Sequence, residues 1–188
     1  MYPVYNIGDE VKLNDDTSWY VVEKSDGSKP NVLILYNGLL DVNEDGKIDD
    51  NDKKQYSSGN VSYDVLDSSS IAYYLENEYK QKLEKKVGEI NSISLFDSKQ
   101  FVRIRDTFKY GYEWENENIL TSNAINEYFV STTHDKIYFV SRSGAYKLSK
   151  PTDRHYIRYV IDIDKESIKK EESLQEKTEE DKKTAGQE

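Results

Sequence analysis

VLILY, from Val32 to Tyr36, is a continuous apolar run in a chain of 188 residues that is otherwise rich in charge. A run this short with turn residues at its end predicts a buried β-strand, because a helix needs a longer apolar pattern. Asn37 and Gly38 form the turn that ends it, and the turn sequence SDGSKP, from Ser25 to Pro30, precedes it. We therefore expect a sheet that buries this strand.

Further strands are predicted on both sides of this run. The segments with strand-like alternation or β-branched and aromatic residues are 11–13, 19–23, 137–141, 145–149 and 156–164. The turns Asn14-Asp15-Asp16 and Arg142-Ser143-Gly144 join two pairs of them into hairpins. Strands near both ends, with helices between, predict an α+β domain in which the terminal segments pair.

The helices are expected between these strands. The strongest pattern is IAYYLENEYKQKLEKK, which starts at Ile71 after the cap residues Asp67 to Ser70 and ends just before Gly88. Its apolar residues recur near helical spacing, at Ile71, Tyr74, Leu75, Tyr79 and Leu83. A shorter helix is predicted from Ser98, where a strand is the alternative, and another from Asn123 to Tyr128.

Length and composition predict one domain with a tail. We assign residues 1–164 to a single α+β domain and residues 165–188 to a charged, disordered tail, because Asp164 onward holds almost no large apolar residue. The fold class expected for the domain is a mixed sheet with one to three helices. The absence of Cys excludes disulfides.

The charge balance narrows the range of partners. A net charge of -10 and a pI near 4.8 argue against nucleic acid and anionic membranes, because both require clustered Lys and Arg. No apolar run approaches the roughly 20 residues that span a bilayer, and MYPVYNIGDE lacks the features of a signal peptide. We therefore expect no membrane contact by this fragment, and any export signal or anchor to lie outside it.

DVNEDGKIDDND, from Asp41 to Asp52, predicts a calcium-binding loop. Calcium takes six to eight oxygens, and a twelve-residue loop supplies them at fixed positions around a sharp turn. The predicted ligands are Asp41, Asn43, Asp45, Lys47 through its carbonyl, Asp49 through water, and Asp52. Gly46 permits the turn, and Ile48 is expected to pin the loop to the fold.

Two features separate this loop from the EF-hands of intracellular sensors. It closes with Asp52 where those have Glu, and a strand precedes it where those have a helix. Both features resemble the calcium loops of dockerins and other extracellular modules, although a dockerin has two loops and this chain has one. The affinity implied is on the order of 10⁻⁴ to 10⁻³ M. The alternative is an Asx-rich turn that binds no metal.

An enzyme is not expected. The chain has no Cys, and its two histidines, His134 and His155, lie in segments typical of loops or strand edges. A zinc site needs three or four ligands, which two isolated histidines do not provide. Ser167 to Lys170 matches S-x-x-K, but the match lies in the charged tail, where nothing desolvates the lysine.

Several segments, taken in order, resemble an uncharacterised domain common in surface proteins of Firmicutes, especially gut Bacilli. The resemblance covers nearly all of Tyr5 to Ile168. It is carried by YNIGDEVKLNDDTSWYVVE, VLILYNGLL, SSSIAYYLENEYKQKL, ISLFDSKQFVRIRD, IYFVSRSGAYKLS and HYIRYVIDIDKESI. It implies a cell-surface location and a C-type-lectin-like layout, and display on a pilus-like structure where a prepilin-like helix precedes the domain. This chain departs by lacking that helix and by inserting the calcium loop.

The leading hypothesis is a non-catalytic, calcium-stabilised extracellular or cell-surface module with a pilin-like or adhesive role. Its expected partners are calcium, other pilus or surface subunits, and host glycans or proteins. The alternative is a lectin-like carbohydrate binder in which Tyr110, Tyr112 and Trp114 stack on sugars. An enzyme related to sulfatase-modifying oxidases is disfavoured, because that chemistry relies on Cys.

Overall fold

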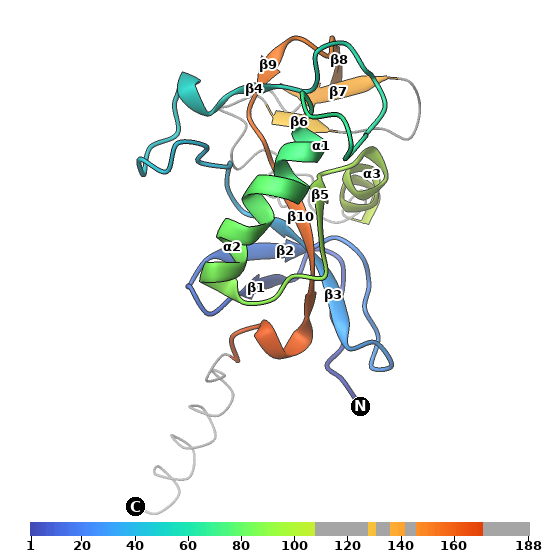
Figure 1. Cartoon of the computed structure of the whole chain (residues 1–188). Coiled ribbons are helices and arrows are strands. Elements are labelled where there is room, and N and C mark those ends of the chain that lie inside the picture. The colour runs from blue at the N-terminus through green and yellow to red at the C-terminus, as the bar shows by residue number, and fades with distance from the viewer. Residues whose placement is uncertain (108–127, 131–135, 142–145, 171–188) are drawn as a thin grey trace, which may run out of the picture.

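A computed structural model of the chain describes residues 1–107, 128–130, 136–141 and 146–170. Its centre is a five-stranded sheet in the order β1-β2-β3-β10-β5. The strands are β1 (Glu10–Lys12), β2 (Ser18–Val21), β3 (Asn31–Tyr36), β10 (Tyr159–Asp164) and β5 (Ser92–Leu95). Strand β10 runs through the middle of the molecule (Figure 1), so the end of the described chain forms part of its core.

The central sheet confirms the strands predicted within 11–13, 19–23, 32–36 and 156–164, adds the unpredicted β5, and corrects the expected strand directions. VLILY lies in β3, and the predicted N-terminal hairpin forms with Val11 opposite Trp19. Strand β3 pairs with β10, which joins the N-terminal and C-terminal segments as expected. The prediction of a mixed sheet is wrong for the described strands, because every neighbouring pair is antiparallel. Residues 13–17 join β1 to β2 and residues 22–30 join β2 to β3, and both connections are shorter than the crossover of about a dozen or more residues that a parallel pair would need.

The predicted helix from Ile71 is confirmed, with an unpredicted irregularity. It comprises α1 (Ile71–Tyr74), a π-helical turn η2 (Leu75–Tyr79) and α2 (Lys80–Val87). The Ser70 hydroxyl accepts a hydrogen bond from the Tyr73 N–H at 3.0 Å, and Gly88 ends the helix with a φ of 96°. None of the helices in the described residues is long and apolar enough to cross a membrane.

Of the two other predicted helices, the structure confirms one and does not describe the other. The shorter helix from Ser98 is confirmed as α3 (Ser98–Thr107). The helix predicted from Asn123 lies outside the described residues, except that Tyr128 begins a strand. Two small sheets complete the fold: β4 with β9, and β6-β7-β8. Their strands are β4 (Lys54–Gln55), β9 (Arg154–His155), β6 (Tyr128–Val130), β7 (Ile137–Val140) and β8 (Tyr146–Ser149).

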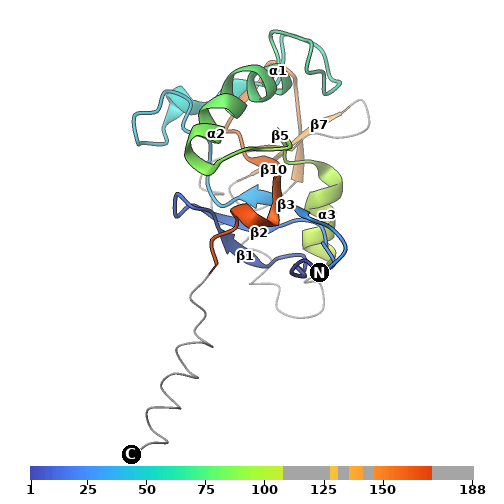
Figure 2. The ribbon, with the colours of Figure 1, turned by 60° about the horizontal axis from the view of Figure 1, so that its bottom comes forward.

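The central sheet is covered on both faces. Successive strand residues point to opposite faces, so Ile34 and Ile161 pack with the helix from Ile71, whereas Leu35 and Val160 pack with α3. Figure 2 shows α1 and α2 on one side of the sheet and α3 on another. Burial on both faces explains why β3 is a continuous apolar run.

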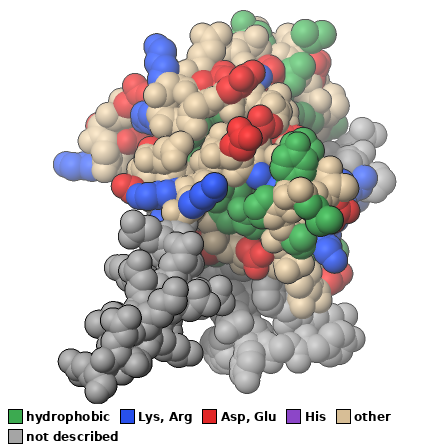
Figure 3. All heavy atoms as spheres, turned by 90° about the horizontal axis from the view of Figure 1, so that it is seen from below, with side chains coloured by type: hydrophobic (Ala, Val, Ile, Leu, Met, Phe, Trp, Pro, Cys, Tyr) green, Lys and Arg blue, Asp and Glu red, His purple; other side chains and the backbone are tan. Residues whose placement is uncertain are grey.

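The packed part of the chain extends past the predicted boundary at residue 164. Lys165 is buried, and its Nζ donates hydrogen bonds to the Pro3 carbonyl at 2.5 Å and the Asp26 carbonyl at 2.8 Å. Ile168 is also buried and forms a β-bridge with Leu13. The first residues and the segment after β10 are therefore held together at one end of the molecule. Hydrophobic side chains gather on this end between charged ones (Figure 3).

A chain of aromatic rings crosses the main core. The Trp19 ring lies 5.0 Å from the Tyr36 ring and 5.6 Å from the Tyr159 ring. Tyr79, in the π turn, lies 5.1 Å from Tyr159, and their hydroxyls are hydrogen-bonded at 2.9 Å. Tyr74 continues the chain by stacking on Tyr79 at 6.2 Å. The hydroxyls of Tyr79 and Tyr159 thus enter the core as a hydrogen-bonded pair.

Buried tyrosines predict a loss of stability at high pH. Burial raises the pKa of Tyr79 from 10.0 to about 12. A raised folded-state pKa gives stability that is complete below pH 10 and is lost as the pH rises through about 12. We expect the melting temperature to fall between these values, and to fall less steeply in Tyr79→Phe. Melts followed by circular dichroism test this, with the exposed Tyr2→Phe as control; equal slopes in both variants would contradict it.

Candidate metal centre

The acidic loop lies on the flank of the molecule and is anchored at both ends. A strand, β3, leads into it, as predicted. Before the loop, Leu40 is buried, and its N–H donates to the Ile157 carbonyl at 2.9 Å. After it, Tyr56 is buried in the main core. Figure 1 shows the loop projecting beside the start of the helix, so its ends are fixed while its middle meets solvent.

Three of the predicted ligands come together in the loop. Asp41, Asp45 and Asp52 each place one carboxylate oxygen so that the three atoms lie within 4.8 Å of one another. Calcium binds oxygens at about 2.3–2.6 Å, so ligands on opposite sides of one ion are up to about 5 Å apart. The three carboxylates therefore have the spacing of atoms that share a calcium ion.

Asp41 carries an oxygen without a partner. Its Oδ2 accepts a hydrogen bond from the Gly46 N–H at 2.8 Å. Its Oδ1 is shielded from solvent and has no hydrogen-bond partner among the described residues. Leaving such an acceptor unsatisfied is unfavourable, and native proteins rarely do so without a bound water or ion. A cation bound by the Asp41 carboxylate would supply the partner that this oxygen lacks.

The turn in the middle of the loop depends on backbone conformation. Gly46 has a φ of 79°, in the region that side chains disfavour, and a Cβ added there would meet no atom within 4 Å. The glycine is therefore required for its φ and not for space. Glu44 also has a positive φ, 58°. The turn directs the Lys47 N–H to Asp45 Oδ1 at 2.9 Å.

Asp52 closes the loop from inside the protein. It is fully buried, and its Oδ1 and Oδ2 accept the N–H groups of Val42 at 2.8 Å and Asp49 at 2.9 Å. Asp49 in turn accepts the Asn51 N–H at 2.9 Å, so it caps the short 3-10 helix η1 (Asp50–Asp52). The Asp49 carboxylate is not part of the three-carboxylate cluster, and its role through water stays a prediction.

The two neutral predicted ligands lie next to Asp45. The Asn43 side-chain amide donates to Asp45 Oδ2 at 3.3 Å. Lys47 is exposed, which suits a ligand that uses only its carbonyl. Whether these two residues coordinate an ion stays a prediction. Both flank the turn at Glu44 to Gly46, which brings Asp45 close to Asp41.

The predicted role of Ile48 is wrong. Its side chain is 38% exposed and does not pin the loop to the fold. Val42 does so instead by packing against the main core. The sequence shows one loop without a twin, so an apolar residue at the eighth position has no second loop to pair with.

Arg154 is a contributor that the sequence did not reveal. Its Nη2 donates to the carbonyls of Lys53 at 2.8 Å and Asp50 at 3.3 Å, and β9 pairs with β4 directly after the loop. Asp50 points away from the cluster to Lys53, 3.0 Å away, and this hydrogen bond lowers the pKa of Asp50. No local pattern could show that a residue about a hundred positions away holds the loop exit.

The other residues that the sequence singled out lie elsewhere. His155 is buried in β9 between the rings of Phe129 and Phe139, with its Nε2 3.2 Å from Ser149 Oγ. This packing is typical of a core histidine. His134, Tyr110, Tyr112 and Trp114 lie outside the described residues.

Comparison with protein-family models, curated proteins and solved structures finds no match to the chain. The chemistry of the loop is therefore the main guide to function. Its candidate donors are all oxygens and include three carboxylates, a set that suits a hard cation such as calcium. Zinc, by contrast, favours nitrogen and sulfur ligands.

Proposed function

We propose that this chain is a non-catalytic, calcium-stabilised module of the cell surface or extracellular space, with a pilin-like or adhesive role. The calcium ion binds in the loop from Asp41 to Asp52. Asp41, Asp45 and Asp52 supply carboxylate oxygens, and Asn43, the Lys47 carbonyl and Asp49 complete the site. The observation that carries the proposal is the buried, unpartnered Oδ1 of Asp41 beside two further carboxylates.

The electrostatics of the loop favour a divalent cation. Three carboxylates within 4.8 Å repel one another when no cation lies between them. Calcium relieves this repulsion and also satisfies Asp41 Oδ1. Each carboxylate oxygen accepts more than one partner, so the backbone hydrogen bonds to Asp52 are compatible with an ion.

The geometry suits a structural ion better than a calcium switch. A switch requires an element with two alternative positions, such as the helix that swings in sensor proteins. Here a strand enters the loop, a 3-10 turn leaves it, and Arg154 bonds to the exit. At millimolar calcium and a dissociation constant of about 10⁻⁴ M, binding adds roughly 1.4 kcal/mol to stability.

The location and the finer fold are part of the same proposal. An affinity of about 10⁻⁴ to 10⁻³ M fills the site only at extracellular calcium concentrations. A C-type-lectin-like layout is supported by the pairing of β3 with β10 and by the contact of Lys165 with Pro3, which brings both ends of the domain together. A surface module with adjacent ends is readily displayed by a single stalk or anchor.

The loop offers a matched pair of variants that tests calcium binding. Asp45→Asn removes one charge from the cluster, whereas Asp50→Asn removes one charge from the same loop outside it. Titration calorimetry on chelator-treated protein is expected to show calcium binding that weakens about tenfold or more in Asp45→Asn and by much less in Asp50→Asn. Magnesium is expected to bind more weakly, because it demands a regular octahedron.

Thermal unfolding gives a second readout. For a domain of this size, a loss of about 1.4 kcal/mol corresponds to a fall in melting temperature of about 3–6 °C when a chelator is added. In Asp45→Asn the chelator should lower the melting temperature by about 1–2 °C at most, because a tenfold weaker site adds only about 0.4 kcal/mol at millimolar calcium. The proposal is wrong if calcium gives no calorimetric signal and the chelator leaves the unsubstituted chain unchanged.

A further inference from the structure

A polar hollow lies beside the acidic loop and shares no residue with it. Its volume is about 230 Å³. It is lined by β4, by a serine-rich turn and by the start of the helix, with the residues Lys54, Gln55, Ser68, Ser69, Ser70, Ile71, Tyr73, Tyr74 and Glu78. Figure 1 shows β4 and α1 at the same end of the molecule. The hollow has room for one small ring and is lined mostly by polar side chains.

Several polar groups in this hollow are not used by the protein itself. The Lys54 ammonium lies 3.7 Å above the centre of the Tyr74 ring, and no carboxylate of the described residues pairs with it within 4.0 Å. Gln55, Ser68 and Glu78 make no side-chain hydrogen bond to the rest of the described chain. A cation, an amide, a hydroxyl and a carboxylate thus border one space, and Lys54 is held there by the Tyr74 ring and by its attraction to Glu78.

The helix is distorted where it borders the hollow. The Lys80 N–H bonds to the Leu75 carbonyl, which makes the turn from Leu75 to Tyr79 one residue wider than an α-helical turn. The sequence LENEY contains neither Pro nor Gly, so no helix-breaking residue imposes the distortion. Single π turns cost hydrogen-bond geometry and occur frequently at functional sites. Glu78 lies within this turn.

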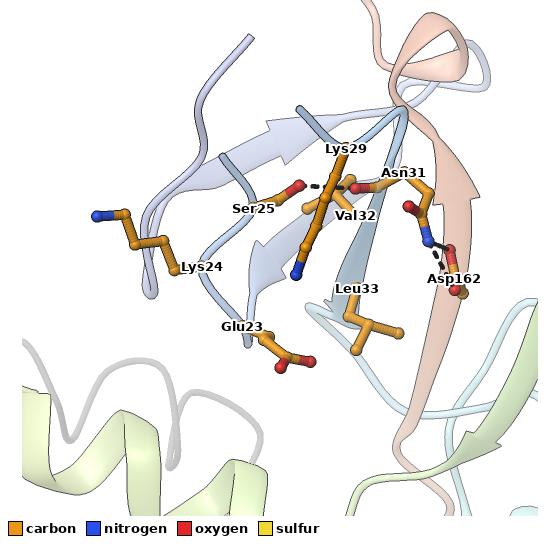
Figure 4. Close-up of a pocket in the computed structure, with 8 residues that line it drawn as sticks. All are labelled: Glu23, Lys24, Ser25, Lys29, Asn31, Val32, Leu33 and Asp162. Atoms are coloured by element: carbon orange, nitrogen blue, oxygen red, sulfur yellow. Dashed lines mark hydrogen bonds between the residues drawn. The ribbon is translucent and has the colours of Figure 1, made fainter. Parts of the chain in front are cut away.

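A second hollow of similar size shows the contrast. It has a volume of about 210 Å³ and lies next to β3 and β10 (Figure 4). There the Asn31 amide donates to both oxygens of Asp162, at 2.8 and 3.0 Å, and the Ser25 hydroxyl donates to the Asn31 carbonyl at 2.7 Å. The Lys24 side chain points away from the hollow in Figure 4. Its polar groups are largely satisfied within the protein.

We propose that the hollow formed by β4, the turn at Ser68 to Ser70 and the start of the helix binds one sugar residue that carries a carboxylate. The Lys54 ammonium binds the carboxylate through a charge-assisted hydrogen bond. The sugar hydroxyls bind Gln55, Ser68 and Glu78, of which the Glu78 carboxylate acts only as an acceptor. The nearby amino end of the helix also favours a negative group.

The lining argues against other ligands. An apolar molecule would have to displace water from the Lys54 and Gln55 side chains, which are half-buried, and offer them no hydrogen-bond partner in return. A phosphate dianion carries two charges where the hollow offers a single lysine, so its second charge would add to the repulsion from Glu78, which a sugar with one carboxylate can avoid by turning its neutral hydroxyls towards Glu78. The site uses none of the proposed calcium ligands, so it does not depend on calcium binding.

The test compares sugars that differ in one carboxylate. Ligand-detected NMR and calorimetry would measure binding of galacturonate and glucuronate, and of their neutral parents galactose and glucose, to the full chain at fixed calcium concentration. We expect the uronates to bind at least about tenfold more tightly than the neutral sugars. Absence of uronate binding, or equal binding of acidic and neutral sugars, would overturn the proposal.

Three variants assign the binding to the hollow. Lys54→Met should weaken uronate binding at least about tenfold, whereas Lys29→Met, which makes the same change beside the second hollow, should leave it unchanged. Ser68→Tyr fills the hollow from an exposed position and should abolish binding even if Lys54→Met proves unstable. Undiminished binding in Ser68→Tyr would contradict the proposal. Calcium titration of each variant is measured separately, so a failed calcium site is distinguished from a failed sugar site.

Discussion

Asp52→Ala is expected to lower the free energy of unfolding by about 2–4 kcal/mol, even with a chelator present. Asp52 is fully buried and accepts the N–H groups of Val42 and Asp49. Alanine leaves both donors without this acceptor, and each unsatisfied buried donor costs about 1–3 kcal/mol. It also removes one side of the capping box that holds the 3-10 turn.

Urea unfolding followed by circular dichroism measures this effect. Asp50→Ala is the matched control, because the Asp50 side chain is exposed and its ion pair with Lys53 lies at the surface. Its cost is expected to stay within about 0.5 kcal/mol. Equal losses in the two variants would show that Asp52 contributes only through charge. The expected loss exceeds the roughly 1.4 kcal/mol proposed for calcium, so the hydrogen bonds of Asp52 are expected to stabilise the loop more than a bound ion would.

Trp19→Ala is expected to cost about 3–5 kcal/mol. The indole is fully buried, and its Nε1 donates to the Thr17 hydroxyl at 2.8 Å. It also contacts Tyr36 and Tyr159, so its loss opens a cavity at the junction of three strands. Domains have only about 5–15 kcal/mol of stability in total, and a substantial fraction of this variant should be unfolded at 37 °C if the domain lies at the low end of that range.

Two control variants test whether the loss of stability comes from the packing of the buried Trp19 ring or from truncating any aromatic residue. Trp19→Phe retains a ring and should lose clearly less stability than Trp19→Ala. Tyr2→Ala truncates an aromatic residue that is 45% exposed and should change stability little. Urea unfolding of the three variants gives the order directly. A Trp19→Ala protein as stable as Tyr2→Ala would show that the aromatic chain does not support the core.

The elements that were predictable from the sequence are those with local signals. VLILY is apolar along its whole length, and both of its faces are covered in the fold. Ser70 and Gly88 mark the ends of the long helix through a hydroxyl cap and a positive φ, which are properties of single residues. The loop residues Asp41, Asp45 and Asp52 were found by their spacing, and the structure brings their carboxylates together.

The features that were missed depend on distant parts of the chain. Arg154 reaches the loop exit only because β9 pairs with β4. Ile48 fits the pattern of a buried position, but no element in the described chain covers it. The π turn at Leu75 to Tyr79 has no Pro or Gly to signal it, and the contact of its Tyr79 with Tyr159 on β10 joins residues 80 positions apart, which the local sequence does not reveal.

The Lys165 contacts with Pro3 and Asp26 have a mechanical consequence. Because these bonds hold the two ends of the domain at one point, a force that pulls residues 1 and 170 apart acts first on them and on the bridge from Leu13 to Ile168. The acidic loop, the polar hollow and the helix from Ile71 lie away from these contacts. A domain tethered by both ends can therefore stretch at its base while the loop and the hollow keep their shape.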